Sequence, residues 1–194
     1  WHPQIVYSYV ESSPEPWAME PSQCINYVSC HDNFTLYDKL KMSLPEATEE
    51  ELRKRVKLTG AILLTAQGIP FLHSGTEFCR TKGGHGNSYL SPDIVNQLDW
   101  SLKATCQDVN DYFIKLIRLR KNHPLFRIPS ADRIRKNLTF CMKYQMGVIS
   151  CCIDGHGLGD KWKKAVVIFN ANIENVDVLI PEGPFTLIAR EDII

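Results

Sequence analysis

Polar side chains that could act as acids, bases or ligands follow two short apolar runs. A His-Asp-Asn triplet containing Asp32 follows residues 24–29, and Glu77 follows residues 69–73. Both runs are predicted to be short buried strands, and α/β proteins bind ligands at the carboxyl ends of their strands. Two carboxylates at neighbouring strand ends suit glycoside hydrolysis, which pairs an acid with a nucleophile or base. Because Asp-Asn is also common turn chemistry, spacing alone leaves a structural role open.

Other catalytic classes have little support in the sequence. A serine hydrolase of the α/β type needs the nucleophile elbow G-x-S-x-G, which the chain lacks. The glycines within 83–86 lie in a predicted loop, outside the strand–turn–helix frame of a phosphate site. Cys24, Cys30 and His31 form a loose cluster, whereas zinc sites favour two close ligand pairs. We therefore expect no metal and no organic cofactor.

Composition is that of an ordinary globular protein and argues against two kinds of partner. The 194 residues are 44% hydrophobic and 23% charged, and 22 basic residues balance 22 acidic ones. A nucleic-acid partner would normally leave a basic excess. No apolar run approaches the ~20 residues of a membrane span. Neither nucleic acid nor membrane is expected as a partner.

Seven scattered cysteines, an odd number, cannot all pair within the chain. They are interpreted as small buried apolar residues in a reducing compartment, which predicts a cytoplasmic location. The chain opens on Trp1 rather than Met, and no secretory signal follows. Since the true N-terminus is expected to lie upstream, a secreted or periplasmic location stays open.

Two amphipathic helices are expected to position the polar groups. The first begins near Glu49, because Thr48 and Glu51 form a capping-box pattern. Its apolar face contains Leu52, Val56 and Leu63. Its charges predict three i,i+4 ion pairs with the acid first, namely Glu49–Arg53, Glu50–Lys54 and Glu51–Arg55.

The second helix is expected to be capped by Asp108 and to end at Asn122-His123-Pro124. One of its faces is predicted to contain Tyr112, Phe113, Leu116 and Ile117. The polar stretch 80–107 between the helices is too long for a routine connection, and such loops are often functional.

After Pro124 the pattern changes to short β-rich runs separated by turn residues. A small antiparallel β domain is expected, with its boundary at 124–133. The predicted strands are 138–144, 147–153, 165–170, 176–180 and 185–189.

Three long motifs occur in order along the chain. Residues 27–40 read Y-V-S-C-H-D-N-F-T-L-Y-D-K-L, residues 68–78 read G-I-P-F-L-H-S-G-T-E-F, and residues 87–100 read N-S-Y-L-S-P-D-I-V-N-Q-L-D-W. Together they resemble glycoside hydrolase family 13, the α-amylase superfamily, in the form of the type I pullulanases. The first resembles the fourth conserved region of that family, the second its last barrel strand, and the third a pullulanase loop. The resemblance covers about residues 25–190.

The resemblance implies roles for individual residues. Asp32 matches the carboxylate that stabilises the oxocarbenium-like transition state, and His31 and Asn33 match neighbours that hydrogen-bond the substrate. Asp93 matches a carboxylate that binds a glucose on the non-reducing side of the cleavage point. Gln97, also expected to bind substrate, stands where many amylases have an arginine.

Two further residues are expected to support the site. Glu77 matches a strand-end position of the family, and Tyr89 belongs to the loop motif. With these roles, Asp32 and Glu77 are not the acid–nucleophile pair. That pair is expected upstream of Trp1, on barrel strands four and five, because the family's nucleophile and acid regions are not found in this sequence.

The implied fold class is α/β followed by all-β. A (β/α)8 TIM barrel takes roughly 250 residues, so residues 1–124 would supply its last two strand–helix units. Residues 125–194 would form an antiparallel β-sandwich, incomplete at its C-terminus. The implied function is part of a debranching enzyme that hydrolyses α-1,6-glucosidic linkages in pullulan, starch or glycogen-derived dextrins with retention. The expected partners are the α-glucan and the rest of the catalytic domain, and the chain alone is expected to be inactive.

Two alternatives stay open. The first is another family 13 enzyme, namely an isoamylase, a branching enzyme or an α-amylase, against which the loop motif at 87–100 argues. The second is a non-catalytic carbohydrate-binding module, which the β-rich tail would suggest. The signature residues, however, lie in the strand and loop region before that tail.

Overall fold

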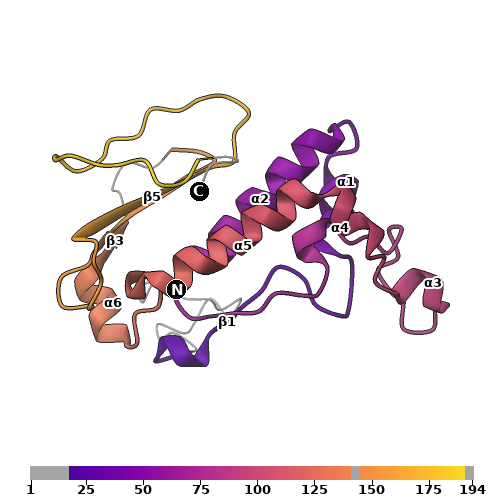
Figure 1. Cartoon of the computed structure of the whole chain (residues 1–194), viewed down its shortest axis with the longest axis horizontal. Coiled ribbons are helices and arrows are strands. Elements are labelled where there is room, and N and C mark those ends of the chain that lie inside the picture. Colours follow the sequence, from indigo (N-terminus) through magenta and orange to yellow (C-terminus); the bar gives the residue numbers. More distant parts are fainter. Residues whose placement is uncertain (1–17, 141–144, 191–194) are drawn as a thin grey trace, which may run out of the picture. The chain divides into compact units, whose positions relative to one another are not determined.

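The computed structural model describes residues 18–140 and 145–190. The chain forms two compact units. We call Tyr27–Leu64, Pro70–Arg118 and Leu187–Ile194 the helical unit, and Trp1–Asn26, Thr65–Ile69 and Leu119–Thr186 the sheet unit. Figure 1 shows the elements, which are η1 (Pro21–Gln23), β1 (Ile25–Asn26), α1 (Leu36–Ser43), α2 (Glu49–Thr65), β2 (Ile69–Pro70), η2 (Thr76–Phe78), α3 (Asp93–Asn96), α4 (Ser101–Thr105), α5 (Gln107–Asn122), η3 (Pro124–Phe126), α6 (Ala131–Asn137), β3 (Leu138–Phe140), β4 (Val148–Asp154) and β5 (Lys164–Asn170).

The helical unit is built around α2 and α5, which lie side by side in Figure 1. The predicted capping box starts α2: the Thr48 amide donates to Glu51 Oε2 at 2.7 Å, and the Glu51 amide donates to Thr48 Oγ1 at 3.3 Å. Gly60 lets the helices approach closely, because a Cβ there would stand 2.4 Å from Cζ of Phe113. The buried hydrophobic side chains of the pair are Leu52, Val56, Leu63, Leu64, Val109, Tyr112, Phe113 and Leu116.

Asp108 joins α5 to α2 instead of capping α5. The helix begins one residue earlier than predicted, at Gln107, and the Asp108 carboxylate lies 2.8 Å from Lys57 Nζ and 3.4 Å from Arg53. Burial opposes ionisation of Asp108, but the Lys57 hydrogen bond and both positive charges outweigh it, so its pKa is lowered. Arg53 and Asp108 meet in the first part of each helix, and Gly60 and Phe113 meet further along both, so α2 and α5 run in the same direction.

The predicted charge pattern of α2 is confirmed at one pair and wrong at another. Glu50 and Lys54 lie 2.9 Å apart. Glu49 instead contacts Lys41 of α1 at 3.8 Å, while Arg53 contacts α5. Of the four residues predicted to share one face of α5, Tyr112, Phe113 and Leu116 are buried and Ile117 is 37% exposed. The contacts of Glu49 and Arg53 with other helices are not revealed by the helical periodicity.

The sheet unit contains a three-stranded antiparallel sheet in the order β3-β4-β5. In its register Leu138 faces Ile153 and Ile153 faces Ala165. These three residues belong to a buried cluster with Leu125, Phe126 and Ile134. The predicted strands at 147–153 and 165–170 are therefore confirmed within one residue. The strand predicted over 138–144 is confirmed to Phe140, and its residues 141–144 lie outside the described residues.

Two buried polar side chains hold the sheet unit together around the end of α2. Gln67 Nε2 donates to the Leu125 carbonyl at 2.8 Å, and Gln67 Oε1 accepts from the Ile128 amide at 2.9 Å. The Arg120 guanidinium donates to the carbonyls of Ala66, Phe126 and Gly68 at 2.7–2.8 Å. Burial lowers the pKa of Arg120 to about 10.

Four strand predictions are wrong in whole or in part. The run 69–73 forms strand only at β2, whose Ile69 is 47% exposed. The run 24–29 forms strand only at β1, whose Ile25 is 60% exposed. The runs 176–180 and 185–189 form no strand. Pro181, Gly183 and Pro184 interrupt that region, and proline removes the amide hydrogens that a sheet ladder needs. Within the described residues, no helix is long and apolar enough to cross a membrane.

Candidate functional site

The turn after β1 places the predicted catalytic carboxylate in solvent. Asp32 Oδ2 lies 3.5 Å from His31 Nε2, and the two side chains are 81% and 87% exposed. Asn33 takes the left-handed conformation, with φ 66°, which asparagine tolerates better than most residues. Its side-chain oxygen accepts the Phe34 amide at 2.9 Å. The turn therefore reverses the chain sharply and presents His31 and Asp32 outward.

Helix α1 closes this turn. Thr35 is its N-cap, and its Oγ1 accepts the Asp38 amide at 3.1 Å. The aromatic rings of Tyr27 and Phe71, next to the two strand ends, meet edge to face with centroids 6.3 Å apart. The ends of β1 and β2 are thus neighbours, as predicted, because the two strands form one sheet.

Glu77 lies in the 3-10 helix η2 after β2. Its Oε2 accepts the Gly75 amide at 3.0 Å, and Gly75 has φ 94°, a conformation that favours glycine. The carboxylate therefore fixes its own turn. This position fits the supporting role expected for Glu77.

Three more predicted site residues lie on the loop between η2 and α5. Asp93 begins the short helix α3, and Gln97 follows it, with the Gln97 amide donating to the Asp93 carbonyl at 2.7 Å. Both side chains are exposed, and Tyr89 is 76% exposed. The loop thus carries an aromatic, an acid and an amide that are all accessible to a ligand.

Buried polar residues beneath this loop form a network that sequence reasoning missed. Asp38 of α1 accepts hydrogen bonds from the Thr81 hydroxyl and, at 2.8 Å, from the Lys82 amide. The Lys82 ammonium donates to the His31 carbonyl at 3.2 Å and to Ser88 Oγ at 3.0 Å. Lys82 is only 3% exposed. The network thus links α1, the His31 turn and the loop.

The missed residues differ in the signal that they leave in the sequence. Asp38, Ser88 and Asn96 are part of the quoted motifs, but nothing in the motifs says that Asp38 and Ser88 are buried or that all three belong to one hydrogen-bond network. Lys82 stands beside Arg80 and Thr81 in a plain polar run. Only the tertiary structure shows that this run passes under the site.

His73 lies near the same cations. It is partly buried, and burial, followed by the charges of Arg80 and Lys82, lowers its pKa. Arg80 Nη1 lies 3.3 Å from His73 Nε2. Because the guanidinium can only donate, His73 Nε2 accepts this hydrogen bond. The ring is then neutral.

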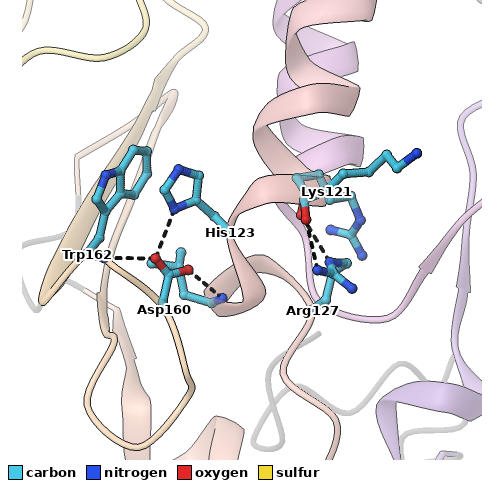
Figure 2. A network of polar contacts seen from close by, with 7 residues as sticks. Lys121, His123, Arg127, Asp160 and Trp162 are labelled. Carbon is cyan, nitrogen blue, oxygen red and sulfur yellow. Dashed lines mark hydrogen bonds and ion pairs between the residues drawn. The ribbon is translucent and has the colours of Figure 1, made fainter.

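A second His–Asp pair, in the sheet unit, offers a contrasting candidate (Figure 2). His123 Nδ1 lies 2.9 Å from Asp160 Oδ1, and the side chains are 4% and 0% exposed. The amides of Trp162 and Leu125 donate to the same carboxylate at 2.8 and 3.1 Å. The His123 and Trp162 rings stack with centroids 3.4 Å apart. This pair is closed to a substrate and acts as a structural clamp.

Arg127 holds the end of α5 in the same unit, and Figure 2 shows it beside Lys121. Arg127 donates to the carbonyls of Arg120 and Lys121, both at 3.0 Å. These carbonyls end α5, where positive side chains are favourable.

The thiols and acids give no metal centre in the described part of the chain. There, no group of three or more His, Cys, Asp or Glu side chains is arranged to hold a metal ion. Four of the six described cysteines are buried.

Asp32 follows the end of β1 and is exposed, and the loop residues Tyr89, Asp93 and Gln97 are exposed as well. Residues 85–188 match the family described as "Alpha-1,6-glucosidases, pullulanase-type, C-terminal". This match spans more than half of the chain, and the chain belongs to that family.

Relatives extend the likeness over most of the chain. A pullulanase of Bacillus subtilis (strain 168) is 42% identical over 174 residues, which cover 89% of this chain and 24% of the relative. The crystal structure of a Paenibacillus barengoltzii pullulanase with maltohexaose and α-cyclodextrin matches with TM-score 0.82 and 46% identity, covering 87% of this chain and 26% of that one. The Anoxybacillus sp. LM18-11 pullulanase with maltotetraose matches with TM-score 0.81 and 42% identity, covering 86% and 24%. The chain spans about a quarter of the length of these proteins.

Proposed function

We propose that this chain belongs to the carboxyl-terminal part of an α-1,6-glucan debranching enzyme. Its family and its similarity to pullulanases support the reaction. The neighbours solved with maltohexaose and maltotetraose support an α-glucan as ligand. The substrates would be pullulan, starch or glycogen-derived dextrins, hydrolysed with retention at α-1,6 linkages.

The observation that carries the proposal is the exposure of Asp32. Its carboxylate is 81% exposed, and its ion-pair partner among the described residues, His31, is 87% exposed. A carboxylate held this way can face a sugar ring without first breaking a buried contact. We assign to it the stabilisation of the positive charge that develops on the ring in the transition state.

The other site residues would bind and orient the glucan. His31 and Asn33 flank Asp32 and would hydrogen-bond the sugar at the cleavage point. Asp93 and Gln97, on the loop, would bind glucose on the non-reducing side. Glu77 and Tyr89 would support the site from the end of β2 and from the loop.

The fold assignment that goes with this function is also a proposal. We place β1 and β2 as the seventh and eighth strands of a (β/α)8 barrel within residues 1–124, each followed by a long helix. The pairing of β1 with β2 and the common direction of α2 and α5 support this. Residues 125–194 would belong to a β-sandwich domain. The nucleophile and the general acid would come from strands four and five, outside this chain.

The test uses the full-length protein that carries this chain. With pullulan it should release maltotriose, the repeating unit between α-1,6 links, and with linear amylose it should release little sugar. Asp32→Ala should lower turnover by several orders of magnitude, about 10³-fold or more, because a charge-stabilising group is lost in the transition state. Asp111→Ala, at an exposed position of α5, is the matched control.

Two outcomes would overturn the proposal. One is hydrolysis of amylose in preference to pullulan, and the other is near-normal turnover of Asp32→Ala. We also expect the isolated 194-residue chain to release no reducing sugar from pullulan. Release by the pure chain that Asp32→Ala abolishes would contradict the assignment of the acid and nucleophile to other segments.

A further inference from the structure

Lys82 carries a buried positive charge that has no ion-pair partner among the described residues. It is 3% exposed, and its ammonium hydrogen-bonds two neutral oxygens, the His31 carbonyl and Ser88 Oγ. In the described part of the chain, no carboxylate forms an ion pair with this ammonium, and the hydrogen bond that Asp38 accepts from Lys82 comes from its backbone amide. An unpaired buried cation is costly. A residue kept in this state has a task that a neutral side chain would not perform.

The first contact of the Lys82 ammonium is with the turn that carries Asp32. The His31 carbonyl belongs to the peptide group that joins His31 to Asp32, so the ammonium fixes the backbone beside the proposed catalytic carboxylate. Gly86 reaches the same turn from the loop, because a Cβ on it would stand 3.0 Å from the Phe34 ring. The loop thus packs on the turn through both a charge-assisted hydrogen bond and a ring contact.

The second contact of the Lys82 ammonium is with the loop that carries Asp93 and Gln97. Ser88 Oγ, which accepts from Lys82, donates to Asn96 Oδ1 at 2.9 Å. Asn96 Nδ2 returns a hydrogen bond to the Ser88 carbonyl at 2.7 Å. Asn96 lies between the two proposed sugar-binding residues. The ammonium therefore reaches α3 through two consecutive hydrogen bonds.

Arg80 makes the corresponding link to the end of β2. Its guanidinium donates to the Asn96 carbonyl, to His73 Nε2 at 3.3 Å and to the Ser74 carbonyl at 3.4 Å. The stem of Arg80 packs on Gly75, where a Cβ would stand 2.6 Å from the Arg80 Cβ. Both cations, starting from one short segment of the chain, thus converge on Asn96.

We propose that Lys82 and Arg80 are positioning residues that set the distance between Asp32 and the sugar-binding residues of the loop. Lys82 ties Asn96 to the turn of Asp32, and Arg80 ties it to the end of β2. This inference rests on the proposed function, because the roles of Asp32, Asp93 and Gln97 come from it. It gives a physical reason for the burial of Lys82, and it offers a way to change substrate binding without replacing a residue that contacts the sugar.

The main test is a double-mutant cycle in the full-length protein with pullulan. Lys82→Met keeps the length and apolar stem of the side chain and removes its charge, and it should lower kcat/KM by about 100-fold, the cost of misplacing a site by about 1 Å. In an Asp93→Ala background the same substitution should cost less than about 10-fold, because the misplaced contact is already absent. Lys103→Met, an exposed lysine of α4, is the control and should leave kcat/KM within about twofold.

A second readout does not depend on hydrolysis. Hydrogen exchange of amides 85–97 in the full-length protein should become faster in Lys82→Met and in the milder Ser88→Ala, and stay unchanged in Lys103→Met. If the wild-type protein fails to cleave pullulan, the proposed function fails while this exchange still decides whether Lys82 holds the loop. If Lys82→Met does not fold, Ser88→Ala takes its place in both assays.

The inference is overturned by either of two results. The first is a loss in kcat/KM for Lys82→Met that multiplies with the loss for Asp93→Ala, which would show independent effects. The second is unchanged exchange of the loop in both variants. Faster exchange together with non-multiplying losses supports it.

Discussion

Two pairs of the same residue types, His31–Asp32 and His123–Asp160, show how environment decides what a His–Asp pair can do. In the turn after β1 the nitrogen and oxygen are 3.5 Å apart and both side chains are more than four-fifths exposed. In the sheet unit the atoms are 2.9 Å apart and both side chains are almost fully buried. The first pair is available to a ligand, and the second is already satisfied by its own protein.

The buried pair is satisfied on every side. Besides His123, the amides of Leu125 and Trp162 donate to the Asp160 carboxylate, and the Trp162 ring covers the imidazole. A better hydrogen-bonded carboxylate is thus a poorer candidate for chemistry, because every bond to a substrate would first break one of these. The role proposed for Asp32 requires the opposite arrangement, in which the pair is exposed and its backbone is held by the hydrogen bond from Lys82 to the His31 carbonyl.

The largest expected effect is a difference in the loss of stability when the aspartate of each His–Asp pair is replaced. Asp160→Ala removes the partner of a buried imidazole and of two buried amides, so it should lower the opening free energy of this region by about 3–5 kcal/mol. Asp32→Ala, at an exposed site, should change stability by no more than about 0.5 kcal/mol. The measurement is hydrogen exchange at the Leu125 and Trp162 amides of the full-length protein.

The contrast breaks down if Asp160→Ala leaves exchange at these amides unchanged. Asp132→Ala serves as the matched control, because the Asp132 side chain is 95% exposed and its partner Arg135 is half-exposed. A loss of similar size in that control would mean that burial is not the deciding factor.

The Trp162 ring, which stacks on His123, is expected to contribute less to stability than Asp160 does. Trp162→Leu removes the ring over His123 but keeps the backbone amide that donates to Asp160. Relative to Trp162→Phe, which keeps an aromatic face, we expect an extra loss of about 0.5–1.5 kcal/mol in the same exchange experiment. Equal losses in the two variants would show that only the apolar area of residue 162 matters.

A third effect is confined to acid pH. Burial tends to raise the pKa of Asp160, but hydrogen bonds from the Trp162 amide, the His123 ring and the Leu125 amide outweigh it, so the pKa lies below its ordinary value of 3.8. A carboxyl group whose pKa is lowered by folding stabilises the folded state. This stabilisation is complete at a pH above the pKa of the unfolded state, and it is lost as the pH falls through the pKa of the folded state. Opening of this region should therefore become easier below about pH 4. In Asp160→Asn this pH dependence should be reduced, and an unchanged acid limb would contradict the assignment.

Local patterns predicted the two long helices, α2 and α5, but not α1 or α6, and α6 lies in the part of the chain expected to be all-β. Thr48 and Glu51 fix the start of α2 through their own short-range hydrogen bonds, so four residues of sequence contain the whole signal. The exposed site residues were also accessible to sequence reasoning, because a His-Asp-Asn triplet after an apolar run is a local feature. The placement of Asp32 in solvent agrees with the role expected from the resemblance, and that role stays a prediction.

Non-local contacts account for most of what the sequence did not reveal. Lys82 reaches the His31 carbonyl across 51 positions of the chain, and Arg120 reaches the Gly68 carbonyl across 52. Neither contact changes the periodicity or composition around these residues. The strands predicted after residue 175 failed for a related reason, since a strand forms only where a neighbour accepts its hydrogen bonds, and β-propensity does not show whether that neighbour is present.

The smallest expected effect on stability concerns a charged pair that is as close as His123 and Asp160 but exposed, so it separates the contribution of burial from that of distance. Glu50 and Lys54 are 2.9 Å apart, as close as His123 and Asp160, but their side chains are 78% and 51% exposed. Water already screens these charges, so Glu50→Gln should lower the stability of α2 by only about 0.3–0.5 kcal/mol, and by nothing measurable in about 1 M salt. Hydrogen exchange of the α2 amides in low and high salt checks this, with Glu46→Gln, at an exposed position before the helix, as control. A salt-independent loss of several kcal/mol would show that the short distance, and not the burial, makes a charged pair strong, and the contrast between the exposed and the buried His–Asp pairs would then lose its physical basis.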